Sequence, residues 1–244
     1  MLNVINKMIS SSISMAFLMV LSWSAAYTYG WGQSYYYGFP WWCVDVGVDN
    51  IARSLGYVLY VTLWLFAAYL SGLLLLTKVK PFLSLSCVKF LRALIVVAVL
   101  WLYLLIGSVL LTGKITQQIG LGYVIVVICS TVIFQSSINQ HIQSLHLANM
   151  LRLIYHYKSY VILSTYLYFV IFAFLTGYFR PYFKTGFDQL EIDHKMYYVL
   201  AKYNKTFVLS EEVKRDNEHF YLYEISPNQL NHIQVVTLNR KILE

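Results

Sequence analysis

Five stretches of about 20 residues without Asp, Glu, Lys, Arg or His constrain this chain more than any other feature. They are Met8–Thr28, Leu55–Leu76, Ala93–Thr112, Ile119–Ile138 and Tyr160–Tyr178. Because a helix rises about 1.5 Å per residue, each stretch is long enough to cross the hydrocarbon layer of a bilayer. Only 12% of the 244 residues are charged, against about 25% in soluble domains. The sequence therefore predicts an all-α polytopic membrane protein with about five transmembrane helices.

The first stretch also has the layout of a signal peptide. Lys7 precedes it, and the small residues Ser24, Ala25 and Ala26 could serve as a cleavage site. Cleaved or retained, this segment delivers the following residues to the far side of the membrane.

Basic residues in the short loops predict the orientation, since Lys and Arg concentrate on the cytoplasmic side. The loop at residues 77–92 carries four of them, and the loop at residues 139–159 carries Arg152 and Lys158. The first loop, residues 29–54, holds one base and two acids. We expect a bacterial inner-membrane protein with a cytoplasmic N-terminus and a periplasmic C-terminal domain.

A second topology stays open at this point. Arg180 and Lys184 follow the last stretch directly, which favours a cytoplasmic position for the residues after it. If one of the two stretches flanking Lys114 is re-entrant, only four segments span the membrane. The C-terminal domain would then lie in the cytoplasm.

The composition changes after residue 183, and residues 184–244 are predicted to form a small β-rich domain distinct from the helical domain at 1–183. The runs rich in β-forming residues are Met196–Tyr203, Thr206–Leu209, Phe220–Ile225 and Ile233–Leu238. Asn204 and Lys205 form the expected turn between the first two. About 60 residues make a marginal core, so we expect this domain to lean on the membrane or on another protein.

The first loop concentrates aromatic side chains, and it supplies the candidate recognition residues Trp31, Tyr36, Trp41, Trp42, Asp45, Asp49 and Arg53. Tyr and Trp favour the headgroup region of membranes, so one interpretation is an aromatic belt. The other is a recognition surface, since Gly38 and Pro40 would bend the chain among large rigid rings. The three charges recur every four residues, so a helix here would align them.

Residues 139–159 alternate apolar and basic or polar side chains. This pattern fits an interfacial amphipathic helix that meets anionic lipid, and equally an extension of a neighbouring span.

Sequence signatures of catalysis and cofactor binding are missing. The three cysteines form no C-x-x-C pair, His141 and His146 are five residues apart, and no Gly-rich phosphate loop occurs. Ser86–Lys89 matches S-x-x-K without its companion motifs, so we attribute the match to chance. We expect no enzyme activity, no cofactor and no metal, and no nucleic-acid binding, since the tail carries no basic cluster.

In its layout of several uncharged spans with a small polar appendage, the chain resembles bacterial inner-membrane immunity and defence proteins. These include immunity proteins against pore-forming toxins and membrane subunits of phage-defence systems such as Kiwa. The resemblance rests on layout alone and implies recognition of a membrane-active toxin or an envelope disturbance. Partners would be the lipid bilayer, a toxin or another protein, and possible further copies of the chain. A homo-oligomeric channel and an accessory or scaffold subunit with a cytosolic effector are the alternatives.

Overall fold

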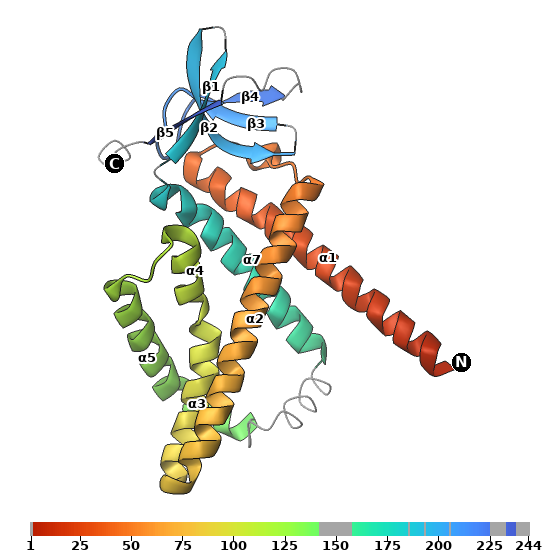
Figure 1. The fold of residues 1–244 in the computed structure, drawn as a ribbon, viewed down its shortest axis with the longest axis vertical. Helices are drawn as coiled ribbons and strands as arrows, with labels where there is room; N and C mark the ends of the chain where they lie inside the picture. The colour runs from red at the N-terminus through yellow and green to blue at the C-terminus, as the bar shows by residue number, and fades with distance from the viewer. Residues whose placement is uncertain are drawn as a thin grey trace. The chain divides into compact units, whose positions relative to one another are not determined.

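The computed structural model describes residues 2–141, 158–184, 186–192, 194–204, 206–224 and 233–237. Among these residues, helices come first along the chain, and a five-stranded antiparallel sheet follows them (Figure 1). The chain divides into two compact units. One comprises residues 1–58 and 166–244, and the other comprises Leu59–Thr165.

Four helical segments among the described residues are long and apolar enough to cross a membrane. They are Val48–Phe82, Leu85–Thr112, Gln117–Gln135 and Ser159–Phe183, and they match the second to fifth predicted stretches. The first predicted stretch lies within α1 (Leu2–Tyr37). Several of its side chains, those of Met8–Ser11 and Ile13, lie outside the described part.

The predicted loops are longer than the connections in the structure. Helix α1 continues to Tyr37 and α2 (Val48–Val79) begins eleven residues later, so the connector is far shorter than residues 29–54. Nothing before Gly38 stops the helix, but Gly38 has a φ of +87° and Pro40 follows shortly after. The short helix η1 (Trp41–Cys43) lies within this connector. The expected helix at residues 139–159 falls largely on residues 142–157, outside the described residues.

The second unit is built from apolar helices. After α2 and the short η2 (Lys80–Phe82), Ser84 caps α3 (Leu85–Trp101) by accepting a bond from the Cys87 N–H. The helix is interrupted at Leu102 and continues as α4 (Tyr103–Thr112). Helix α5 (Gln117–His141) packs against α3, where the Tyr123 hydroxyl donates to the Ala98 carbonyl at 2.9 Å.

The sheet belongs to the first unit and follows α7 (Lys158–Phe183). Its strands are β1 (Gly186–Ile192), β2 (Lys195–Tyr203), β3 (Thr206–Ser210), β4 (Tyr221–Glu224) and β5 (Ile233–Thr237), in the order β4-β3-β2-β1-β5. The prediction of a small antiparallel sheet is confirmed. It missed β1, because Asp188 and Glu191 dilute the apolar alternation of that strand.

Two-residue turns set the register of the hairpins. Ile192 pairs with Lys195, and Tyr203 pairs with Thr206. His194 and Asn204 adopt positive φ values of 64° and 44° in these turns, as tight hairpins require. A bulge between Val199 and Ala201 shifts the β2–β3 register. Leu200 and Ala201 both join the cluster that α1 contacts, whereas Val199 joins a second cluster.

Candidate interaction site where α1 meets the sheet

The C-terminal end of α1 is capped by a loop of the sheet domain. The last carbonyls of a helix have no partner within the helix. Here the backbone N–H groups of Asp216 and Asn217 donate to the carbonyls of Tyr36 and Tyr37 at 3.2 and 2.7 Å. The N–H of Gly38 donates to the Ser34 carbonyl at 2.8 Å. The end of α1 is therefore bonded to residues about 180 positions later in the sequence.

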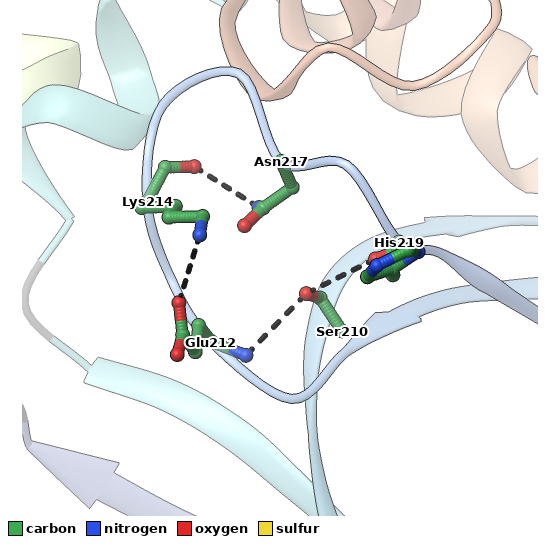
Figure 2. A network of polar contacts seen from close by, with 5 residues as sticks. All are labelled: Ser210, Glu212, Lys214, Asn217 and His219. Carbon is green, nitrogen blue, oxygen red and sulfur yellow. Dashed lines mark hydrogen bonds and ion pairs between the residues drawn. The ribbon is translucent and has the colours of Figure 1, made fainter.

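The capping loop is braced by its own polar contacts (Figure 2). The Asn217 amide donates to the Lys214 carbonyl at 3.0 Å, and Lys214 pairs with Glu212 at 3.0 Å. The Ser210 hydroxyl lies between the His219 carbonyl and the Glu212 N–H. These bonds hold the loop in the shape that presents its two N–H groups to α1.

An aromatic cluster fills the space between α1, the connector and the sheet, and we call it the α1–sheet junction. Its buried members are Tyr36, Tyr37, Phe39 and Val44 from the helix end and connector, and Phe187, Leu200, Ala201, Tyr203, Val208 and Val213 from the sheet domain. Tyr37 is 1% exposed and Phe187 is fully buried. Burial of several aromatic side chains contributes on the order of 2 kcal/mol each. The sheet therefore packs tightly on the end of α1.

Tyr203 connects this cluster to a chain of polar contacts. Its hydroxyl points at Gln33 Oε1 and at the Gly30 carbonyl oxygen, at 3.1 and 3.3 Å. The Gln33 amide reaches the Tyr29 hydroxyl at 3.5 Å, and Arg180 donates to that same hydroxyl at 3.0 Å. Burial raises the pKa of Tyr203 well above its ordinary value, so the hydroxyl stays protonated and acts as a donor.

Glycines allow α1 and α7 to cross at short distance. A Cβ atom on Gly32 would collide with the Phe174 carbonyl oxygen, and one on Gly177 would collide with the Tyr29 carbonyl oxygen. Close backbone approach through small residues is a common means of packing helices in membranes. Farther from the sheet on the same helix pair, the Tyr166 hydroxyl donates to the Ser24 hydroxyl oxygen at 2.9 Å.

Burial lowers the pKa of Lys184, which follows α7, although the nearby Asp188 acts in the opposite direction. Its Nζ lies 4.4 Å from the centre of the Phe187 ring. The positive charge after α7 is thus drawn toward the junction, since a cation is attracted to the face of an aromatic ring.

The predicted aromatic residues separate into two groups. Tyr36 is 7% exposed and belongs to the junction, so it is a packing residue in this structure. Trp31, Trp41 and Trp42 are 44%, 54% and 71% exposed. Trp41 and Trp42 form an edge-to-face pair in η1 with ring centres 5.9 Å apart. The structure therefore does not bring all four rings into one surface.

Of the three predicted charged residues, Asp45 contacts the sheet domain, whereas Asp49 and Arg53 lie in α2. Asp45 accepts a bond from the Asn204 side chain at 3.0 Å, which joins the connector to the β2–β3 turn. Asp49 lies in the first turn of α2 and Arg53 follows one turn later, both exposed. The ion pairs found in the described part of the chain do not include Asp49 with Arg53. Asp49 instead suits the positive end of the α2 dipole.

The sequence analysis missed the polar chain of Tyr29, Gln33, Arg180 and Tyr203. Tyr29 and Gln33 are one helical turn apart, but Arg180 and Tyr203 lie 151 and 170 positions from their partners on α1, so no spacing rule could add them. Within the described residues no group of His, Cys, Asp or Glu is arranged to hold a metal ion.

Comparison with known proteins decides the family. A family model described as "Type IV pilus biogenesis protein TfpB" matches residues 1–185. The chain belongs to the TfpB family of type IV pilus biogenesis proteins. Protein TfpB of Moraxella bovis is 32% identical over 243 residues, covering 96% of this chain and 92% of that protein. No solved structure matches.

Membership of the TfpB family corrects the functional prediction. The resemblance to toxin-immunity and phage-defence proteins is wrong, and so are the toxin partner, the toxin resistance and the antiviral role that it implied. Layout misled because many unrelated membrane proteins combine several spans with a small polar domain, and a shared architecture does not determine function. The channel and the scaffold for a cytosolic effector find no support in the comparisons either.

Proposed function

We propose that this protein is a non-catalytic integral membrane component of type IV pilus biogenesis. It holds the junction and the sheet on one side of the membrane, where other proteins of the pilus machinery bind them. The observation that carries this proposal is the family match over residues 1–185, which contain the four candidate membrane-spanning helices found among the described residues.

The contact between connector and sheet supports a five-span topology. In the described part of the chain, four apolar helical segments separate the connector from the sheet, and an even number of crossings returns a chain to the same side. Asp45 of the connector bonds to Asn204 of the sheet, and Phe39 packs against Tyr203 with ring centres 6.3 Å apart. A re-entrant segment near Lys114 would put these partners on opposite sides of the membrane. With α1 included, the chain crosses five times.

The distribution of basic residues supports an extracytoplasmic position for the sheet. Lys78, Lys80, Lys89 and Arg92 gather where α2 meets α3, whereas the connector holds Asp45 and no base. Positive residues favour the cytoplasmic side. The N-terminus is then cytoplasmic, and the sheet faces the periplasm in a bacterial inner membrane.

Exposed residues around the connector provide the proposed contact with a pilus protein. Trp41 and Trp42 point away from the cluster that buries Phe39 and Val44. Asp49 and Arg53 lie exposed at the start of α2. Tyr and Trp side chains supply large contact areas at low cost in side-chain entropy, and Trp and Arg dominate the binding energy of many interfaces.

Two native cysteines test the topology. Cys43 lies in the connector and Cys87 lies at the start of α3, on opposite sides in the proposed arrangement. A maleimide that does not cross membranes should label Cys43 and spare Cys87 in intact spheroplasts of a Cys129→Ser strain. Burial raises the pKa of the Cys43 thiol, so labelling should quicken as the pH rises. Labelling of Cys87 alone would overturn the proposed orientation.

Deletion of the gene in its host tests the biological role. We expect the deletion strain to lose surface pili while pilin accumulates in the cells, and a plasmid copy to restore assembly. A photo-crosslinking amino acid at Trp42 should then capture a protein of the pilus machinery, whereas the same amino acid at the lipid-facing candidate Ile133 should not. Normal piliation in the deletion strain would overturn the proposal.

A further inference from the structure

Helices α1 and α7 present a patch of exposed aromatic side chains near their C-terminal ends, which lead to the connector and to the sheet. Trp31 and Tyr35 of α1 and Phe179 and Tyr182 of α7 are 44%, 64%, 45% and 57% exposed. Trp31 and Tyr35 both contact Phe174 of α7, with ring centres 5.5 and 6.3 Å apart. The exposed rings therefore border one continuous contact between the two helices.

The height of this patch follows from the helix rise. The uncharged run in α1 ends at Thr28 and that in α7 ends at Tyr178. At 1.5 Å per residue, Trp31 lies about 4.5 Å beyond its run and Tyr182 about 6 Å beyond its own. The headgroup layer on each side of a bilayer is about 5–8 Å thick. Trp31, Phe179 and Tyr182 thus fall within that layer when both runs span the hydrocarbon.

The connector lies farther from the hydrocarbon layer than this patch does. Helix α1 ends nine residues after Thr28, and α2 begins seven residues before Leu55. Those residues rise about 13 and 10 Å along the two helices. Both estimates put Trp41 and Trp42 at or above the outer limit of the headgroups.

Residue chemistry favours lipid as the occupant of the patch. Tyr and Trp seek the headgroup level because the ring is apolar and the OH or NH group seeks water. Arg180 is exposed between Phe179 and Tyr182 and donates to the Tyr29 hydroxyl through Nη1. Its remaining guanidinium donors suit lipid phosphate, because Arg binds phosphate oxygens through several N–H groups.

We infer that Trp31, Phe179 and Tyr182, with Arg180, form an anchor in the lipid headgroup layer, which seats the sheet directly on the membrane surface. This inference rests on the proposed membrane insertion and goes beyond it in assigning the depth of named residues. A pilus protein that binds the connector must then approach within about one helix diameter of the bilayer, about 10–12 Å.

Quenching of tryptophan emission by brominated lipids tests the anchor. The chain has six Trp residues, so variants that retain only Trp31, Trp42 or Trp64 carry five Trp→Phe substitutions. Each variant is reconstituted into vesicles whose lipids carry bromine near the carbonyl end or near the methyl end of the acyl chain. Trp31 should lose most emission to bromine near the carbonyl end, and Trp42 should lose little to either lipid.

Trp64 separates failure of the anchor from failure of membrane insertion. It lies near the middle of the Leu55–Leu76 run, so bromine near the methyl end should quench it most. If Trp64 is quenched but Trp31 responds to neither lipid, a protein partner covers the patch and the anchor is overturned. If bromine near the methyl end quenches Trp31 most, as expected for Trp64, the anchor is overturned as well. If Trp64 is not quenched, both the insertion and the anchor that rests on it fall.

Single Trp→Phe substitutions compare the depths of Trp31 and Trp42 without replacing five tryptophans at once. The emission lost between the wild-type chain and Trp31→Phe, measured in each lipid, isolates the quenching of Trp31, and Trp42→Phe is the matched control. Equal depth profiles for the two positions would overturn the anchor.

Discussion

At the α1–sheet junction, polar groups bond to partners far away in the sequence, whereas in the α3–α5 helix pair they bond mostly within their own helix. Tyr203 reaches Gln33, and Asn217 reaches Tyr37. In the helix pair, Thr131 of α5 donates to the carbonyl four residues earlier, and Ser108 of α4, which follows α3, donates to the carbonyl three residues earlier. Tyr123 with Ala98 is a long-range exception. This difference fits the environments we propose, since hydrocarbon offers polar groups no other partner than the helix itself.

The α1–sheet junction should tolerate substitutions less well than the apolar helices. The junction combines a tight glycine crossing, buried rings and capped carbonyls in one unit, so each of its parts restricts the others. The exposed sides of α2 and α5 carry large apolar residues such as Leu63, Trp64 and Ile133, which are suited to a uniform apolar surrounding. We therefore expect substitutions at the junction to cost more than equivalent changes on those helices.

The largest effect should come from Gly177→Ala. The added methyl group meets the Tyr29 carbonyl, so α1 and α7 must separate. Overpacking of this kind costs about 1–3 kcal/mol, and the midpoint of thermal unfolding in detergent should fall. Gly122→Ala in α5 is the control, since nothing lies within 4 Å of its added Cβ. That variant should be neutral or more stable, by at most about 1 kcal/mol. Equal losses of stability in the two variants would contradict the difference in packing between the α1–α7 crossing and α5.

Two tyrosines of the junction should differ in how the stability of the protein depends on their hydroxyl group. Tyr203→Phe removes a donor to Gln33 and Gly30, which should cost about 1–2 kcal/mol. The buried Tyr37 hydroxyl finds no partner among the described residues, so Tyr37→Phe should leave stability unchanged or raise it by about 1 kcal/mol. Both are measured as free energies of unfolding in the same detergent. A loss in Tyr37→Phe as large as that in Tyr203→Phe would contradict the packing described for the junction.

Asn217→Ala should have a smaller effect. The buried amide no longer braces the Lys214 carbonyl, and the loop that caps α1 loosens at a cost of about 1 kcal/mol. Hydrogen exchange at the Asn217 backbone N–H should accelerate, because that group bonds to the Tyr37 carbonyl. Lys214→Met is the control: it removes an exposed ion pair but leaves the accepting carbonyl in place. If Lys214→Met accelerates exchange at this N–H as much as Asn217→Ala does, the Asn217 side-chain amide is not what holds the capping loop in place.

Asp45→Asn should have the smallest effect. Its bond to Asn204 is exposed, and an exposed charged contact contributes about 0–1 kcal/mol. We expect a loss of at most about 0.5 kcal/mol. Asp49→Asn, which lies at the N-terminus of α2, should lose a similar amount through the helix dipole. Double substitution tests additivity, since the two residues have no common partner among the contacts found in the described part of the chain.

Much of the fold was predictable from local pattern. The run from Leu55 to Leu76 predicts an apolar helix without reference to any other part of the chain, and α2 contains it. Asn204 predicts a hairpin turn, because Asn tolerates positive φ. The end of α1 was misplaced by nine residues, about two and a half helical turns, since aromatic residues suit a helix end and a loop equally. The candidate recognition residues were identified by type, but their division into buried Tyr36 and exposed Trp42 was not predictable.

Local sequence patterns account for the apolar helices and for the presence of a C-terminal sheet. These properties depend on the composition and period of neighbouring residues. Only the tertiary structure decided that the sheet caps α1, that Gly32 and Gly177 mark a helix crossing and that Tyr203 meets Gln33. Those contacts join residues about 140–180 positions apart. They depend on shape and hydrogen-bond geometry in space, which the order of residues along the chain does not display.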